Sequence, residues 1–208
     1  MGNNSKSKGL SRRQFITRAG TGAVGSVVLF PALGKADTKI PVDDNSKQKY
    51  LLGDNPLSLT VNGKKVKIKV KANTTLVELL RDHLHLTGTK VACNNGECGS
   101  CSVLLDGKVV YSCHMLALDA QGKSVTTVEG LMDGNKLSVV QQAFVEKDGL
   151  QCGFCTPGQV MAATALLTKN PHPTKDEVKE GMSGNFCRCG AYPKIIESVL
   201  TAAEKLNS

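Results

Sequence analysis

Eight cysteines in two groups of four constrain this 208-residue chain more than any other feature. The first group is a tight loop with one distant member, and the second is two close pairs. The groups are Cys93, Cys98, Cys101 and Cys113, followed by Cys152, Cys155, Cys187 and Cys189. Such short spacings predict metal centres or disulfides. The chain therefore has to fold around two cysteine sites.

The first group has the spacing C-x4-C-x2-C, with a fourth cysteine twelve residues further on. This is the spacing of plant-type ferredoxins, in which four thiolates hold a [2Fe–2S] cluster. Gly96 and Gly99 permit the curled backbone that lets three thiolates of one loop converge. A zinc ribbon usually has two short cysteine pairs. Cysteine makes up about 4% of the chain, below the roughly 8–10% of disulfide scaffolds. We therefore expect a [2Fe–2S] cluster here.

The second group, C-x2-C at 152–155 and C-x-C at 187–189, is ambiguous by itself. Each pair precedes a predicted helix, and helix N-termini favour the negative charge of a thiolate-bound cluster. We expect the pairs to meet if the two helices pack antiparallel. The spacing also fits a zinc site or a redox-active disulfide between Cys152 and Cys155. The residues alone leave these three possibilities open.

Residues 56–130 have the pattern of a small sheet crossed by one helix. Apolar and polar residues alternate over 57–61 and 66–70, on either side of the hairpin signal Asn62-Gly63. Thr75 and Glu78 form a capping box in front of a leucine stripe. Further strands are predicted at 102–105, 109–113 and 124–128. These elements predict a β-grasp domain of the ferredoxin type.

Residues 131–208 show helical periodicity and no strand pattern. Thr156 is expected to cap a helix that has Pro157 at its first position. That helix is apolar almost all round, so we expect it to be buried. A capping box at Thr174 and an amphipathic run over 192–206 indicate further helices. The predicted fold class is α+β, with a β-grasp domain followed by an all-α four-helix domain that binds the second cluster.

The basic excess of the chain is concentrated at its N-terminus. The net charge is +8, but residues 1–36 hold six of the 26 basic residues and none of the 18 acidic ones. The remainder carries 20 basic against 18 acidic residues and is close to neutral. A nucleic-acid role is therefore poorly supported.

The N-terminal stretch resembles a twin-arginine export signal. Ser11-Arg12-Arg13-Gln14-Phe15-Ile16 precedes an apolar run at 19–33 and the small-x-small site Gly34-Lys35-Ala36. We expect residues 1–36 to be a cleaved signal read by the twin-arginine machinery and residues 37–55 to be a flexible lead-in. The protein would then be periplasmic, exported with its clusters already loaded. The run is short for a stable membrane span, and an uncleaved anchor is the alternative.

Five stretches together resemble one known family. They read TLVELLRD at 75–82, CNNGECGSC at 93–101, VEGL at 128–131, QCGFCTPG at 151–158 and NFCRCG at 185–190. They are similar to the small iron–sulfur subunit of the molybdenum hydroxylases, the xanthine dehydrogenase and aldehyde oxidase family. The last two stretches are specific to that family. Ala92 and His114 depart from its pattern beside cysteine ligands.

The resemblance implies a role for each cysteine group. Cys152, Cys155, Cys187 and Cys189 would hold the inner cluster, nearer the molybdenum–pterin cofactor of a large partner subunit. Gln151 and Cys189 would approach the pterin. Cys93, Cys98, Cys101 and Cys113 would hold the outer cluster, which would face the next electron acceptor, in this family usually FAD on a third subunit. The chain itself would contain no catalytic residue.

Family and export signal together predict the iron–sulfur subunit of a periplasmic aldehyde oxidoreductase, which converts aldehydes to carboxylic acids. An alternative within the family oxidises an N-heterocycle and delivers electrons to cytochrome c without a flavin subunit. From other classes, a stand-alone ferredoxin-like carrier would not need the second domain, and a secreted disulfide or zinc-binding protein would contain no iron.

Overall fold

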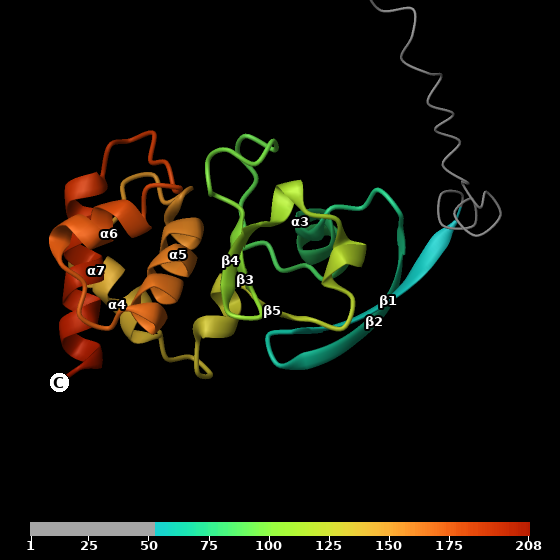
Figure 1. Cartoon of the computed structure of the whole chain (residues 1–208), viewed down its shortest axis with the longest axis horizontal. Helices are drawn as coiled ribbons and strands as arrows, with labels where there is room; N and C mark the ends of the chain where they lie inside the picture. The colour runs from blue at the N-terminus through green and yellow to red at the C-terminus, as the bar shows by residue number, and fades with distance from the viewer. Residues whose placement is uncertain (1–52) are drawn as a thin grey trace, which may run out of the picture. The chain divides into compact units, whose positions relative to one another are not determined.

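The computed structural model describes residues 53–208, which all belong to one compact unit (Figure 1). The predicted export signal and nearly all of the predicted lead-in lie outside the described residues. Within residues 53–208, no helix is both long enough and apolar enough to cross a membrane.

A five-stranded mixed sheet occupies the first part of the described chain. Its strands are β1 (Asp54–Val61), β2 (Lys64–Lys71), β3 (Ser102–Leu105), β4 (Lys108–Tyr111) and β5 (Ser124–Thr126), in the order β2-β1-β5-β3-β4. β1 pairs antiparallel with β2 and parallel with β5. Asn62 and Gly63 both have positive φ, of 49° and 77°, as a two-residue hairpin turn requires. The β-grasp prediction is confirmed.

One face of this sheet is covered by the short helix α3 (Leu76–Glu78) and the π-helical turn η1 (Leu79–His83). The capping box is present, since Thr75 accepts a hydrogen bond from the Glu78 N–H while the Glu78 carboxylate accepts one from the Thr75 N–H. Leu76, Leu79 and Leu80 pack onto the buried positions of β1, where apolar residues alternate with polar ones. The alternation seen in the sequence therefore builds one core face.

Several predicted boundaries are wrong by a few residues. β1 begins at Asp54, inside the predicted lead-in, and β4 ends at Tyr111, so that Cys113 lies in the turn η2 (Ser112–His114). β5 ends at Thr126, and the turns η3 (Ala117–Ala120) and η4 (Val128–Leu131) flank it. These turn residues form no ladder of strand hydrogen bonds, but the apolar residues among them resemble the alternating pattern of a strand in the sequence.

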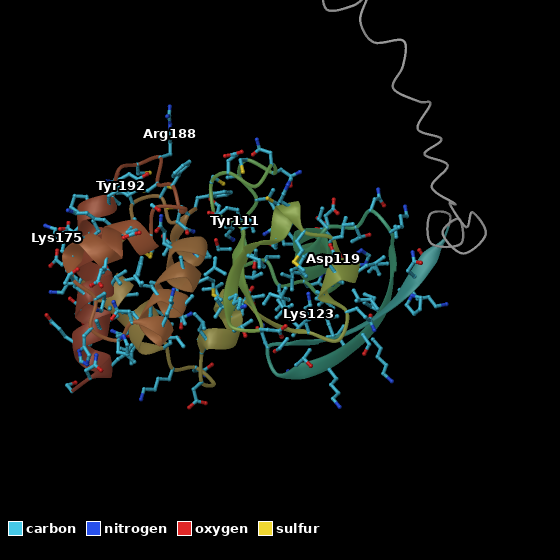
Figure 2. All side chains as sticks on the ribbon, viewed as in Figure 1. Tyr111, Asp119, Lys123, Lys175, Arg188 and Tyr192 are labelled. Atoms are coloured by element: carbon cyan, nitrogen blue, oxygen red, sulfur yellow. The ribbon has the colours of Figure 1, made fainter. Side chains whose placement is uncertain are left out.

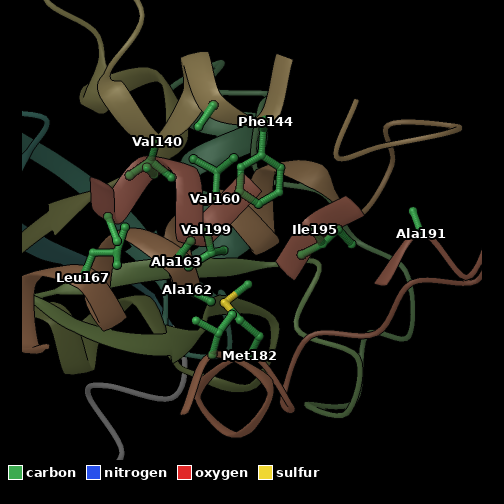
Figure 3. Close-up of a cluster of buried hydrophobic side chains, with 14 of the residues drawn as sticks. Val140, Phe144, Val160, Ala162, Ala163, Leu167, Met182, Ala191, Ile195 and Val199 are labelled. Carbon is green, nitrogen blue, oxygen red and sulfur yellow. The ribbon is translucent and has the colours of Figure 1, made fainter. Parts of the chain in front are cut away.

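The second part of the described chain contains four helices, as predicted. They are α4 (Val139–Glu146), α5 (Thr156–Lys169), α6 (Lys175–Gly181) and α7 (Tyr192–Leu206). Phe144, Val160, Ile195 and Val199 meet in their common core (Figure 3). α5 lies between the other helices and β3 (Figure 1). This position explains why α5 is apolar on nearly every side.

The start of α5 differs from the prediction. Cys155, not Thr156, is the N-cap residue, and Thr156 is the first residue of the helix. The Cys155 carbonyl accepts the first intrahelical hydrogen bond, from the Gln159 N–H at 3.0 Å. Proline tolerates either of the first two helical positions because neither N–H has an intrahelical partner. The Thr156-Pro157 signal therefore locates the helix start only to within one residue.

Candidate metal centres

The outer cysteine loop, residues 93–101, curls back on itself between η1 and β3. Asn94, Gly96 and Gly99 have positive φ, of 56°, 79° and 71°. The Cys93 sulfur accepts a hydrogen bond from the Glu97 N–H at 3.4 Å. A side chain at Gly96 would approach His114 to 3.1 Å, so the loop is closed against the turn that carries Cys113. Both glycines thus have the conformations that the sequence led us to expect.

The structure brings all four outer thiols together as two pairs. Cys93 is close enough to Cys98, and Cys113 to Cys101, for the neighbouring thiol to shift its pKa. Backbone N–H groups, above all that of Asn95, lower the pKa of Cys93 to about 6 against the opposing effect of desolvation. Burial, followed by the contact with Cys101, raises the pKa of Cys113 to about 12. The group therefore contains one readily ionised thiol and one that resists ionisation.

The second group lies in the helical cysteine loops, residues 151–155 and 185–190, which precede α5 and α7. Here Cys152 is close enough to Cys189, and Cys155 to Cys187, for the neighbouring thiol to shift its pKa. α5 and α7 both begin at this end of the domain and run away from it (Figure 1). The expectation of antiparallel packing is therefore wrong, because two N-termini meet side by side only when the helices run in the same direction.

The second group also contains thiols whose pKa values are shifted in opposite directions. A hydrogen bond from the Phe154 N–H lowers the pKa of Cys152. Burial, followed by the contact with Cys187, raises the pKa of Cys155 to about 12. Burial also acts on Cys187, but the Ala191 N–H, which donates to its sulfur at 3.4 Å, and the Cys155 thiol outweigh burial and lower its pKa. The second group therefore contains two thiols with a lowered pKa, Cys152 and Cys187, and one with a raised pKa, Cys155.

These donor sets fit a [2Fe–2S] cluster at both positions. Within residues 53–208, no three His, Cys, Asp or Glu side chains surround a single ion position. Two thiol pairs instead match a core in which four cysteines share two irons. Cys113 and Cys155, whose pKa values burial raises, would be held as thiolates by a positively charged iron centre. All eight cysteines are free of disulfides, and the cluster, when bound, supplies one-electron redox chemistry.

A buried hydroxyl beside the second group also fits a bound cluster. Thr156 follows Cys155 directly, and its Oγ1 atom is buried without a hydrogen-bond partner among the described residues. A buried polar atom without a partner is rare because it forfeits its hydrogen bond to water. Cluster sulfur accepts such hydrogen bonds.

Exposure differs between the two groups. In the second group Cys152 and Cys189 are exposed, as is Gln151, while Cys155 is half-buried and Cys187 is buried. The first group has no exposed member, since Cys93 and Cys98 are half-buried and Cys101 and Cys113 are buried. Phe154 and Phe186, next in sequence to cysteines of the helical loops, are 48% and 55% exposed. Arg188, between two of those cysteines, projects away from the domain (Figure 2). The helical loops therefore present thiols and apolar surface together.

Sequence reasoning missed the residues that join the two groups. Tyr111 donates its hydroxyl hydrogen to the Gly184 carbonyl at 2.8 Å, and the Asn185 amide donates to the Gly99 carbonyl at 2.8 Å. A Cβ atom added to Gly158 would lie 2.2 Å from the carbonyl oxygen of Gly99. The available signal was Gly158 itself, since glycine in the first turn of an otherwise apolar helix needs a packing reason.

Comparison with known proteins supports the cluster reading of both domains. The family model of a 2Fe-2S iron-sulfur cluster binding domain matches residues 59–127. The model of a [2Fe-2S] binding domain matches residues 127–200. The chain therefore contains two [2Fe–2S]-binding domains, and the ambiguity of the second cysteine group is resolved.

Relatives of established function are subunits of oxidoreductases. The aldehyde oxidoreductase iron-sulfur-binding subunit PaoA of Escherichia coli K12 is 42% identical, over 74% of this chain and 73% of PaoA. The nicotine 6-hydroxylase small subunit of Paenarthrobacter nicotinovorans is 47% identical, over 73% of this chain and 92% of that subunit. Both relatives are named as one subunit of a larger enzyme.

Solved structures give the same result. Quinoline 2-oxidoreductase from Pseudomonas putida 86 has a chain with a TM-score of 0.72 and 44% identity, which covers 74% of this chain and 96% of that one. Aldehyde oxidoreductase from Desulfovibrio desulfuricans matches with a TM-score of 0.71 and 40% identity, but the match covers only 17% of that chain. The fold, both cluster-binding domains and the relatives agree, and the chain belongs to the small [2Fe–2S] subunits of the molybdenum hydroxylase family.

Proposed function

We propose that this chain is the electron-transfer subunit of an exported, periplasmic aldehyde oxidoreductase. Electrons from oxidation of an aldehyde to a carboxylic acid would pass from the molybdenum cofactor of the large subunit to the inner cluster. They would continue through the outer cluster to FAD on a third subunit. The aldehyde substrate is supported by the 42% identity to the PaoA subunit. The exported location is supported by the Arg12-Arg13 motif and the run that follows it.

The observation that carries the electron-transfer role is the convergence of eight thiols into four pairs within two adjoining loop regions. Cys93, Cys98, Cys101 and Cys113 are proposed to ligate the outer cluster. Cys152, Cys155, Cys187 and Cys189 are proposed to ligate the inner one, with Gln151 and Cys189 toward the pterin. Four thiolates suffice for each [2Fe–2S] core. The exposure of Cys152 and Cys189 supports the second set as the one that faces the large subunit.

A second candidate has a specific observation in its favour. The small subunit of nicotine 6-hydroxylase and the gamma subunit of caffeine dehydrogenase are 47% and 48% identical to this chain. An enzyme that oxidises an N-heterocycle and reduces cytochrome c is therefore the alternative. Both candidates assign the same role to this chain and differ in its partners.

Purification of the complex from its native source tests the proposal. We expect co-purification with a molybdopterin-containing subunit, with about four irons and four acid-labile sulfides per copy of this chain. Turnover of aldehydes with a flavin subunit present supports the first candidate, and turnover of N-heterocycles with cytochrome c supports the second. Zinc in place of iron, or a fully active monomer, contradicts both.

The export step is tested separately. Replacement of Arg12 and Arg13 by lysine keeps the charge but removes the twin-arginine motif. We expect the variant to accumulate in the cytoplasm with its clusters loaded, as measured by fractionation and iron content. Replacement of Lys6 and Lys8 by arginine is the matched control and should leave export unchanged. Periplasmic accumulation of the Arg12, Arg13 variant contradicts the signal assignment.

A further inference from the structure

Three consecutive residues of the helical domain, Gly184, Asn185 and Phe186, each form a hydrogen bond to the ferredoxin-type domain. The Gly184 carbonyl accepts from Tyr111 at 2.8 Å. The Asn185 side chain donates to the outer cysteine loop, and the Phe186 N–H donates to the Cys98 carbonyl at 2.9 Å. We call this contact, residues 184–186 against residues 98–102 and Tyr111, the seam. It is the place where the two sets of cysteines adjoin.

Asn185 is the side chain at the centre of the seam. It is 4% exposed, and its amide nitrogen donates to the Gly99 carbonyl at 2.8 Å and to Ser102 Oγ at 3.2 Å. Ser102, 1% exposed, donates its own hydroxyl hydrogen to the Gly99 carbonyl at 2.7 Å. Gln159 donates to the Asn185 backbone carbonyl at 2.8 Å. The Asn185 amide nitrogen thus has two buried acceptors, and such a buried hydrogen-bond network favours one geometry.

The backbones at the seam are too close to admit extra atoms. A Cβ atom on Gly99 would lie 2.5 Å from the Gly184 carbonyl oxygen, and one on Gly158 would lie 2.2 Å from the Gly99 oxygen. Packed interiors with no spare volume do not deform gradually. The outer loop and the helical loops therefore meet at close range, and the Asn185 amide forms its hydrogen bonds across this contact.

The residues on either side of the seam are the proposed cluster ligands. Cys98 and Cys101 flank the Gly99-Ser100 pair, and Cys187 follows Phe186 directly. Any shift of the seam thus moves the two sets of ligands relative to each other. We propose that Asn185 is a positioning residue, whose buried amide sets the separation and relative orientation of the two [2Fe–2S] clusters. This inference rests on the ligand assignment in the proposed function.

Magnetic coupling between the clusters tests the inference. In the fully reduced complex, each cluster carries an unpaired spin, and the dipolar splitting of their electron paramagnetic resonance signals falls with the inverse cube of their separation. Asn185→Ala removes both donated hydrogen bonds. Asn207→Ala is the matched control, since the Asn207 amide also donates to two backbone carbonyls, those of Pro171 and Ala203, at the end of the chain.

We expect Asn185→Ala to retain full iron content and to lose the resolved splitting, while Asn207→Ala keeps it. The electron-transfer rate between the clusters, measured after rapid reduction, should fall in the same variant. An unchanged splitting in an iron-replete Asn185→Ala complex overturns the inference, even if that complex melts at a lower temperature. Wild-type protein without iron would instead contradict the proposed function.

A milder variant keeps the inference testable if Asn185→Ala does not accumulate. Ser102→Ala removes the second acceptor of the Asn185 amide and leaves its bond to the Gly99 carbonyl. We expect the splitting of Ser102→Ala to be retained but reduced. A splitting identical to that of the wild-type complex overturns the inference.

Discussion

Gly158 should stabilise the protein although it lies in a helix, where glycine is usually destabilising. Alanine is favoured over glycine in helices by about 1 kcal/mol, so local propensity predicts that Gly158→Ala stabilises α5. The structure predicts the opposite, because the new Cβ would lie 2.2 Å from the Gly99 carbonyl oxygen and 3.1 Å from the Ser100 Cα atom. Carbon and oxygen atoms without a bond between them need over 3 Å, so α5 and the outer loop must separate by about 1 Å.

That separation strains the seam, whose three hydrogen bonds from Tyr111, Asn185 and Phe186 span 2.8, 2.8 and 2.9 Å. At about 1 kcal/mol each, their loss costs about 3 kcal/mol. Helix propensity returns about 1 kcal/mol, so the net destabilisation is about 2 kcal/mol. In a chain of this size that lowers the melting temperature by about 4–8 °C.

The assay is thermal bleaching of the visible cluster absorption in the purified complex. Thr168→Ala, at an exposed position of the same helix, is the control and should raise the midpoint slightly or leave it unchanged. A Gly158→Ala complex as stable as the wild type would refute the reasoning, since it would mean that α5 does not contact the outer loop as described.

Three further outcomes are expected. Cys113→Ser and Cys189→Ser should each reduce iron to about two atoms per chain and remove one of two paramagnetic signals; retention of both signals would reject the ligand assignment. Thr156→Val should lower the reduction potential of the inner cluster, since hydrogen bonds to cluster sulfur help set the potential. The melting temperature should stay unchanged. A lower melting temperature at constant potential would indicate that the Thr156 hydroxyl is hydrogen-bonded to the protein and not to the cluster. Phe144→Ala, at a 1% exposed position, should lower the free energy of unfolding by about 3–5 kcal/mol. Val145→Ala, at a 59% exposed neighbouring position, should change it by less than about 0.5 kcal/mol. Equal effects would show that α4 does not bury Phe144 as described.

The sequence was informative where structure depends on neighbours along the chain. The spacing of Cys93, Cys98 and Cys101 and the glycines between them predicted a curled loop, and Gly96 and Gly99 have the positive φ that such a loop needs. The Thr75, Ser138 and Thr174 capping boxes all form, although only the first and third were predicted. Such features depend on residues within three or four positions, so local patterns report them well.

The seam could not be predicted because its partners are distant in sequence. Asn185 and Gly99 are separated by 86 residues, and no periodicity relates them. The prediction that α5 and α7 pack antiparallel was wrong for the same reason. The spacing of the cysteines indicates that two helix ends meet, but it does not indicate in which direction the helix axes run. The predicted start of α5 was wrong by one residue only, because either Cys155 or Thr156 can be the N-cap of a helix with a proline at position 157.

Exposure within the second cysteine group has a consequence for assembly. Cys152 and Cys189 form the exposed pair, and Cys155 and Cys187 form the pair that faces the domain core. The exposed pair is flanked by Phe154 and Phe186. Exposed aromatic residues that adjoin a functional group mark a surface that a partner covers. Under the proposed ligand assignment, two ligands of the inner cluster, Cys152 and Cys189, would be exposed until a partner covers them, whereas no ligand of the outer cluster is fully exposed, since Cys93 and Cys98 are half-buried and Cys101 and Cys113 are buried. Dissociation of the large subunit should therefore release iron from the inner site first.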